Sequence, residues 1–179
     1  MTTIATIGHS NHPIERLLDL LAAGEVSLLV DIRSVPYSRR FPQFGRERLA
    51  ASLKGAGIGY LWEGESLGGK AGGYNAAAAR PAFKDSLDRL QMLGRSTPLC
   101  LMCAEKDPLA CHRTVLVARR LAERGVAVRH LLADGTVQPH AAIEDALLGT
   151  AADDLFDDRA QRLARAWDTR ERAMKRSSA

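Results

Sequence analysis

The sequence predicts an α/β fold, a single-domain, open and mostly parallel sheet of five strands with helices on both faces. Short apolar runs alternate with helical patterns along most of the 179 residues. The run 27–32 is predominantly apolar, which is typical of parallel strands that are buried on both faces. A composition of 46% hydrophobic and 26% charged residues is ordinary for one globular domain with a sizeable core. Together these observations favour a Rossmann-like sheet.

The predicted strands and helices follow one another in regular order. Strands are expected over 3–7, 27–32, 58–62, 99–103 and 126–132, and helices over 13–23, 46–54, 80–93 and 108–124. Proline stands at the start of three of these helices, and glycine follows the end of each, as these residues prefer. We expect the strand order 3-2-1-4-5, which places the first and fourth strands side by side.

The chain beyond residue 134 lacks this alternation. Two helices are expected there, over 141–148 and 155–174, and the second has an apolar face of Leu155, Phe156, Leu163 and Trp167. We therefore divide the chain into an α/β domain, residues 1–134, and a C-terminal helical extension, residues 135–179, packed on the same domain and frayed at its end.

Apolar runs and cysteine usage exclude several classes of protein. The apolar runs are too short to cross a membrane, and the first residues lack the pattern of a signal peptide. Three cysteines, two of them in one strand, do not resemble a secreted disulfide framework. We therefore expect a cytoplasmic protein with reduced thiols and no membrane partner.

The formal charge is +4, and many of the basic residues lie in two segments, 33–48 and 159–176. In the first segment, aromatic residues are interleaved with arginines, namely Tyr37, Arg39, Arg40, Phe41, Phe44, Arg46 and Arg48. This pattern suits a phosphate-bearing small molecule or single-stranded nucleic acid as a partner. A solvated surface with a few packed aromatic side chains is the alternative.

The stretch 98–113 holds more reactive side chains than any other. It carries two thiols, a carboxylate, an imidazole and a guanidinium, namely Cys103, Cys111, Glu105, His112 and Arg113. A strand gives way here to a helix with Asp107 at its cap and Pro108 at its first position, so unpaired backbone N–H groups face the strand tip. The sequence therefore predicts an active or ligand-binding site at this edge of the sheet.

Polar residues also follow the first two strands, as Gly8-His9-Ser10 and as Asp31 with Arg33. Because the carboxyl ends of parallel strands meet at one edge of a sheet, we expect these clusters to converge on a single pocket. We assign candidate ligand-binding roles to Gly8, Ser10, Asp31, Arg33, Arg39, Tyr60, His112 and Arg113. Arg113 suits a phosphate or a structural carboxylate, and Asp31 is placed to orient Arg33.

The candidate catalytic residues are Glu105, Cys111, Cys103 and His9. Glu105 suits general acid or base catalysis. Cys111 is expected in the first turn of a helix, where the dipole and two neighbouring cations favour a thiolate. Each residue also has a structural alternative, since a cysteine is often a small buried hydrophobe and a lone histidine a structural donor.

Cys100 and Cys103 form a Cys-x-x-Cys pair, but on a strand this spacing sends the two side chains to opposite faces. We therefore assign Cys100 to the core and predict no shared metal, no disulfide and no metal site. The sequence identifies no cofactor, because both the Walker lysine loop and the Gly-x-Gly-x-x-Gly turn are missing.

Short motifs along the first three quarters of the chain carry a family resemblance. They are Thr6-Ile-Gly-His-Ser10, Leu29-Val-Asp-Ile-Arg33, Gly57-Ile-Gly-Tyr60, Leu67-Gly-Gly69, Cys103-Ala-Glu105 with Asp107-Pro108, and Cys111-His-Arg113. In these motifs and their order the chain resembles the bacterial proteins catalogued as domain of unknown function, family number 488. The resemblance implies a single α/β domain with the same clustered positions, and it supplies no substrate or cofactor.

Three functions fit these observations. The first is an enzyme acting on a phosphate-bearing nucleotide, nucleobase or nucleic-acid substrate, a hydrolase or a transferase. The second is cysteine-dependent thiol, sulfur-transfer or phosphate-transfer chemistry through Cys111 or Cys103, although the Cys-x5-Arg spacing of cysteine phosphatases is missing. The third is a non-catalytic nucleic-acid-binding or regulatory domain that uses segment 33–48.

Overall fold

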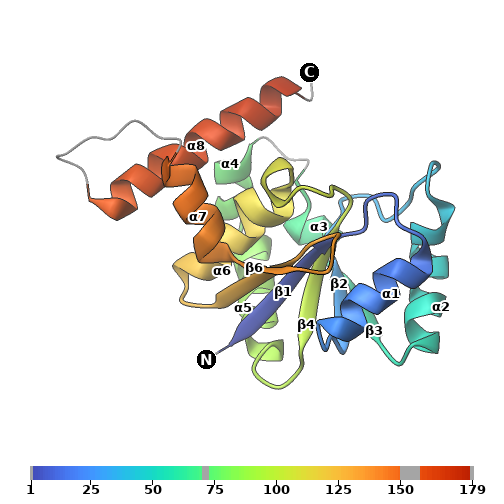
Figure 1. Cartoon of the computed structure of the whole chain (residues 1–179). Helices are drawn as coiled ribbons and strands as arrows, with labels where there is room; N and C mark the ends of the chain where they lie inside the picture. The colour runs from blue at the N-terminus through green and yellow to red at the C-terminus, as the bar shows by residue number, and fades with distance from the viewer. Residues whose placement is uncertain (1, 70–72, 150–157, 178–179) are drawn as a thin grey trace.

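The computed structural model describes residues 2–69, 73–149 and 158–177, and these form one sheet with helices on both sides (Figure 1). Its strands are β1 (Thr3–Gly8), β2 (Leu28–Asp31), β3 (Gly59–Trp62), β4 (Leu99–Cys103), β5 (Ala127–Leu131) and β6 (Val137–Pro139). The helices are α1 (Ile14–Ala23), α2 (Arg46–Gly55), α3 (Gly64–Leu67), α4 (Tyr74–Ala79), α5 (Pro81–Leu93), α6 (Arg119–Glu123), α7 (His140–Gly149) and α8 (Arg159–Ser177). The predicted α/β class is confirmed.

The strand number and order differ from the prediction. The described residues form six strands in the order β3-β2-β4-β1-β5-β6, instead of five in the order 3-2-1-4-5. The sixth strand is a short antiparallel edge, whose three residues give no recognisable pattern in the sequence. β4 lies between β2 and β1, and this central place suits a strand whose five residues are all buried. β1 and β4 are still neighbours, as expected.

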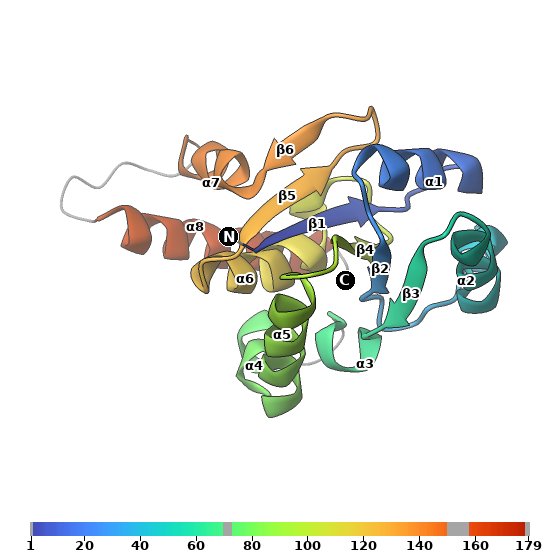
Figure 2. The same cartoon turned by 90° about the horizontal axis from the view of Figure 1, so that it is seen from below.

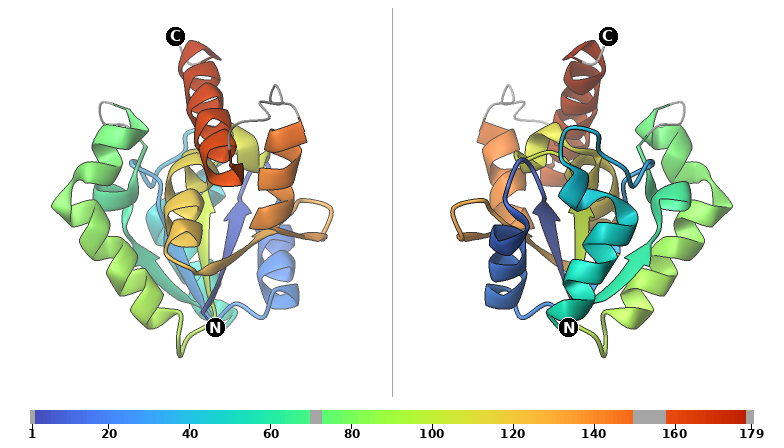
Figure 3. Two further views of the ribbon diagram at one scale, coloured as in Figure 1. Left: turned by 90° about the vertical axis from the view of Figure 1, so that its left-hand side faces the viewer. Right: turned by 90° about the vertical axis from the view of Figure 1, so that its right-hand side faces the viewer.

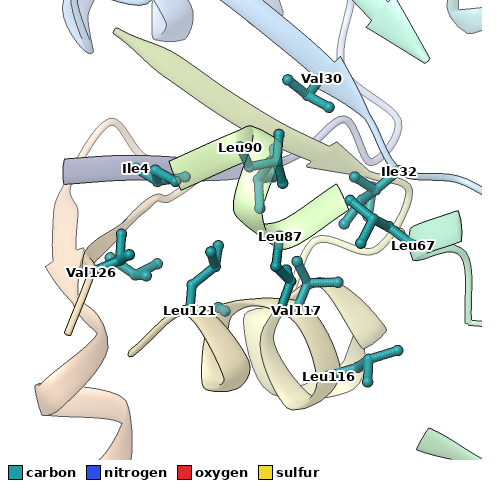
Figure 4. Packing of buried hydrophobic residues seen from close by; sticks show 14 of the residues in the cluster. Ile4, Val30, Ile32, Leu67, Leu87, Leu90, Leu116, Val117, Leu121 and Val126 are labelled. Atoms are coloured by element: carbon teal, nitrogen blue, oxygen red, sulfur yellow. The ribbon is translucent and has the colours of Figure 1, made fainter. Parts of the chain in front are cut away.

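The helices cover both faces of the sheet, as Figures 2 and 3 show. α1 and α2 pack on one face, where Leu17, Leu21 and Leu49 are fully buried. α5 and the segment that ends in α6 pack on the other face, where Leu87, Leu90 and Leu121 form one cluster with the strand residues Ile4 and Val30 (Figure 4). Two cores of this size fix the relative positions of the strand ends.

The predicted helix 108–124 is wrong as a single element. Pro108–Ala110 form a 3-10 turn, η2, in which the Asp107 side chain accepts a hydrogen bond from the N–H of Leu109. The backbone is then extended at Cys111, with φ −133° and ψ 141°, and a π-helical segment, η3 (Arg113–Ala118), leads into α6. Cys111 therefore does not lie in a helical turn, because its extended backbone separates η2 from η3.

The elements that follow β5 complete the sheet and its cover: β6 pairs with β5, α7 packs against β5, and α8 packs against α7 and η3. Trp167 of α8 is fully buried against α7 and η3, in a cluster with Val115, Ile143, Leu147 and Ala166. Leu155 and Phe156, expected on the last helix, lie outside the described residues. Among the described helices, none combines the length and the apolar character needed to span a bilayer.

Candidate functional site

A cleft of about 1030 Å³ opens at the carboxyl ends of β1, β2 and β4. It is lined by His9, Ser10, Asn11, Arg33, Ser34, Val35, Tyr37, Ser38, Arg40, Phe41, Gly69, Tyr74, Cys103, Ala104, Glu105, Lys106 and His112. These residues come from four separate loops, so the cleft exists only in the folded chain.

The central strands bring these loops together. Gly8 is paired with Cys103 in the parallel register of β1 and β4. Beyond the strands, the N–H groups of His9 and Ser10 donate to the carbonyl oxygens of Cys103 and Ala104, at 2.9 Å each. A Cβ at position 8 would collide with the carbonyl of Glu105, so only glycine allows this close approach.

Asp31 holds Arg33 at the wall of the cleft. The carboxylate is fully buried and accepts hydrogen bonds from Nε and Nη2 of Arg33, at 2.8 and 2.6 Å, and from the Tyr60 hydroxyl at 2.9 Å. Arg33 Nη2 also donates to the carbonyl of Phe44 at 2.8 Å, and Nη1 lies 3.3 Å from Nε2 of His9. Four of the five guanidinium N–H groups are thereby used, and the guanidinium is fixed at the cleft.

His9 contacts the Arg33 guanidinium and helps to fix its position. Its Nδ1 donates to the carbonyl of Ser10 at 2.8 Å, which leaves Nε2 to accept from Arg33. The ring stacks on Phe44 at a centroid distance of 4.2 Å, and burial lowers the pKa of His9 to about 4. Both ring nitrogens of a neutral His9 are therefore occupied, and the geometry places it as a positioning residue for Arg33.

Cys103, Cys111 and His112 form a second polar cluster, the thiol–imidazole cluster, at the floor of the cleft. Cys103 Sγ lies 3.4 Å from His112 Nδ1, and His112 Nε2 lies 3.0 Å from the carbonyl oxygen of Ile32. Cys103 and His112 line the cleft, whereas Cys111 lies behind them and is 1% exposed. Among the described residues, this is the group of histidine, cysteine and carboxylate side chains close enough to share a metal ion.

The contacts within the cluster favour a negative charge on Cys111 and a positive charge on His112. Burial opposes ionisation of Cys111, but hydrogen bonds from Cys103 and His112 and the charge of Arg113 outweigh it and hold its pKa well below the usual value. The hydrogen bond to Cys111, with burial, raises the pKa of Cys103. For His112, burial lowers the pKa, but the contact with Cys111 more than compensates and the net shift is upward. Both shifts favour a negative charge on Cys111 over one on Cys103.

Arg113 organises the loop between the two cysteines from inside the protein. Its guanidinium donates to the carbonyl oxygens of Glu105 and Lys106, and its backbone N–H lies 3.4 Å from Cys111 Sγ. The side chain is fully buried and does not line the cleft. Arg113 therefore reaches no ligand in the cleft in this conformation, and its charge acts on Cys111 through the interior.

The rim of the cleft carries exposed charged and aromatic side chains. Arg40 lies over the ring of Phe41, 5.5 Å from its centroid, and Tyr37 is 63% exposed. Lys106 and Glu105 extend from the opposite loop. Asp31 balances the charge of Arg33 in the wall, so Arg40 and Lys106 are the cations that, against Glu105, give the rim a positive excess that suits an anion.

The structure brings some of the predicted site residues into the cleft and leaves others outside it. In the lining are His9, Ser10, Arg33, Cys103, Glu105 and His112. Behind the lining are Gly8, Asp31, Cys111 and Arg113, which contact lining residues, and Tyr60, whose hydroxyl donates to Asp31. Arg39 is exposed and does not line the cleft. Sequence reasoning did not select Ser34, Gly69 and Lys106, although each adjoins or belongs to a motif that it did select.

The chain was compared with known protein families, curated proteins and solved structures. A family model described as "Domain of unknown function DUF488" matches residues 13–120, which include the segment from Cys103 to Arg113. No curated protein and no solved structure matches the chain.

Proposed function

Because the chain belongs to the family described as Domain of unknown function DUF488, its membership names no reaction, and we propose a function from the cleft itself. The protein is an enzyme that acts on an anionic, phosphate-bearing small molecule of the nucleotide class, a hydrolase or transferase with its reactive centre at the thiol–imidazole cluster. One observation carries this proposal: the cluster lies at the floor of a cleft whose wall and rim carry Arg33, Arg40 and Lys106.

The arrangement separates binding from chemistry. Arg33 is fixed by Asp31 and His9 before any ligand arrives, so a phosphate oxygen that meets its remaining N–H encounters an ordered donor. Arg40 and Lys106 are exposed, so their attraction to the ligand is screened by salt. Phe41 and Tyr37 offer apolar surface for a base or another flat ring.

Binding of inorganic phosphate and of AMP tests this proposal by isothermal titration calorimetry at low and at physiological salt. We expect Arg40→Ala to weaken the binding of both probes about five-fold, the equivalent of about 1 kcal/mol for an exposed charge pair. Arg39→Ala is the matched control, because this neighbouring arginine does not line the cleft. Equal effects of the two substitutions, or binding of neither probe by the wild type, would remove the basis for the proposal.

A second candidate is direct thiol chemistry, favoured by the contact between Cys103 and His112. Cys103 lines the cleft, and the imidazole of His112, with Nδ1 3.4 Å from its sulfur, is placed to accept the thiol proton, which would leave Cys103 as a nucleophile. In that case iodoacetamide should alkylate Cys103 before Cys100, which is buried on the other face of the sheet. Phosphate should slow the reaction if both functions share the cleft.

A further inference from the structure

The three donor atoms of the thiol–imidazole cluster have the spacing of a metal site. Cys103 Sγ, Cys111 Sγ and a ring nitrogen of His112 all lie within 4.8 Å of one another. Around a tetrahedral zinc ion, with Zn–S near 2.3 Å and Zn–N near 2.0 Å, neighbouring donors are about 3.5 to 3.8 Å apart. The 3.4 Å between Cys103 Sγ and His112 Nδ1 fits this spacing without movement of the backbone. We propose that Cys103, Cys111 and His112 bind one zinc ion.

The surroundings of His112 prepare it as a ligand. Its Nε2 lies 3.0 Å from the carbonyl oxygen of Ile32, so the N–H of a neutral ring belongs on Nε2. That tautomer leaves the lone pair of Nδ1 directed at the two sulfur atoms. A backbone carbonyl in this place is the usual outer partner of a metal-binding histidine, because it fixes both the tautomer and the orientation of the ring.

The backbone holds the three ligands in place. Cys103 ends β4 at the centre of the sheet, and the extended backbone at Cys111 returns the second sulfur to the first. The Arg113 N–H contacts Cys111 Sγ, and an amide donor of this kind stabilises a thiolate. Gly69 leaves room for the imidazole, since a Cβ at that position would lie 2.9 Å from Cβ and Cγ of His112.

The ligand set leaves one coordination position for the cleft. Within the described part of the chain, the group contains three donors and no fourth histidine, cysteine or carboxylate. Cys103 and His112 line the cleft while Cys111 closes the site from behind. Three protein ligands with an open position are the arrangement of catalytic zinc sites, and two thiolates with an imidazole select zinc over magnesium or calcium.

This inference departs from the expectation of no metal site, which rested on the Cys100 and Cys103 pair. Those two side chains do lie in different cores on opposite faces of the sheet. The partner of Cys103 is Cys111, eight residues along the chain, where the backbone is extended instead of helical.

The zinc site adds a metal ion to the proposed enzyme. It rests on the proposed function only for the identity of the fourth ligand, which would occupy the open coordination position. In the proposed enzyme this group is a water molecule or an oxygen of the phosphate-bearing substrate, which the zinc polarises beside Arg33. The metal site itself needs no substrate, so it is measured separately.

Cobalt titration of the full, reduced and chelator-treated chain tests the site. We expect one equivalent of Co²⁺ to produce the charge-transfer and intense visible bands of tetrahedral thiolate coordination, and Zn²⁺ to displace it. Cys103→Ser, Cys111→Ser and His112→Ala should each abolish these bands, while Cys100→Ala keeps them. Circular dichroism spectra identify any variant that fails to fold.

Gly69→Ala keeps all three donors and provides a milder variant, for which we expect zinc affinity to fall about 10- to 100-fold. No bands in the wild type, or bands that persist in all three ligand variants, would overturn the zinc site. Cobalt binding without phosphate or AMP binding would overturn the proposed substrate class alone, whereas phosphate binding without cobalt binding would overturn the zinc site alone.

Discussion

Two pairs of histidines lie in different regions of this molecule, with three of the four rings buried and His112 half-buried, and their contacts differ. His130 of β5 and His140 of α7 meet where the C-terminal extension packs on the sheet. Thr6 Oγ1 is 2.7 Å from His130 Nδ1, and His130 Nε2 is 3.1 Å from His140 Nδ1. Trp167 stacks on His140, with centroids 5.7 Å apart, and closes the group from solvent. We call this the closed pair.

The other two histidines, His9 and His112, line the cleft at the carboxyl edge of the sheet. Each has one nitrogen at a backbone carbonyl, while the other faces Arg33 or Cys103. In the closed pair the rings bind each other and a core hydroxyl, so they support the packing of the extension. The two pairs therefore differ in their surroundings, because the closed pair meets groups of the core whereas His9 and His112 meet groups that line the cleft.

The largest expected effect comes from breaking the ion pair of the cleft wall. Arg33→Met keeps the apolar bulk of the side chain but leaves Asp31 without its cation. The Asp31 carboxylate is fully buried, so water cannot replace the lost partner. We expect a loss of about 3–5 kcal/mol in the free energy of unfolding, measured by urea denaturation at pH 7. Arg40→Met, an exposed change in the same loop, is the control. A loss below 1 kcal/mol would show that the cleft wall is no more rigid than its rim.

A smaller effect is expected from protonation of the closed pair. Burial lowers the pKa of His130 to about 3 and that of His140 to about 4, whereas both are near 6.5 in an unfolded chain. Between pH 6.5 and about 4 the unfolded state binds more protons, so stability is greatest above this window and falls as the pH falls through it. We expect a cost on the order of 2 kcal/mol for each histidine at pH 5.

Urea denaturation of His130→Gln at pH 7 and pH 5 isolates this contribution. The variant should lose less stability on acidification than the wild type, because one of the titrating rings is gone. His9 acts in the same direction and His112 in the opposite one, but both remain in the variant and cancel in the comparison. Identical losses for the two proteins would show that the closed pair does not titrate as its burial requires.

The smallest effect on stability is expected for the exposed carboxylate of the cleft. Glu105 contributes its backbone carbonyl to Arg113, while its side chain is exposed in the cleft. Glu105→Gln should therefore change the free energy of unfolding by less than about 0.5 kcal/mol in thermal or urea unfolding. A larger loss would show that the Glu105 side chain stabilises the fold as the Arg33 side chain in the cleft wall does. The rim of the cleft would then not differ from its wall in stability.

The sequence predicted the α/β class and the family, and its apolar runs located the first five strands to within one or two residues. These features depend on local patterns, since a buried parallel strand must be apolar and a helix must present one apolar stripe. The residues at the strand ends could be grouped for the same reason, because parallel strands all finish at one edge.

Only the tertiary structure decided the strand order, the break at Cys111 and the roles of the arginines. Arg33 and Arg113 look alike in the sequence, but Asp31 holds Arg33 at the cleft while Arg113 is enclosed beneath the loop from Glu105 to Lys106. Likewise, the partner of Cys103 depends on how the chain returns after an irregular turn. Such outcomes follow from packing between distant segments, which local propensity does not encode, whereas the fold class follows from the periodicity of the chain itself.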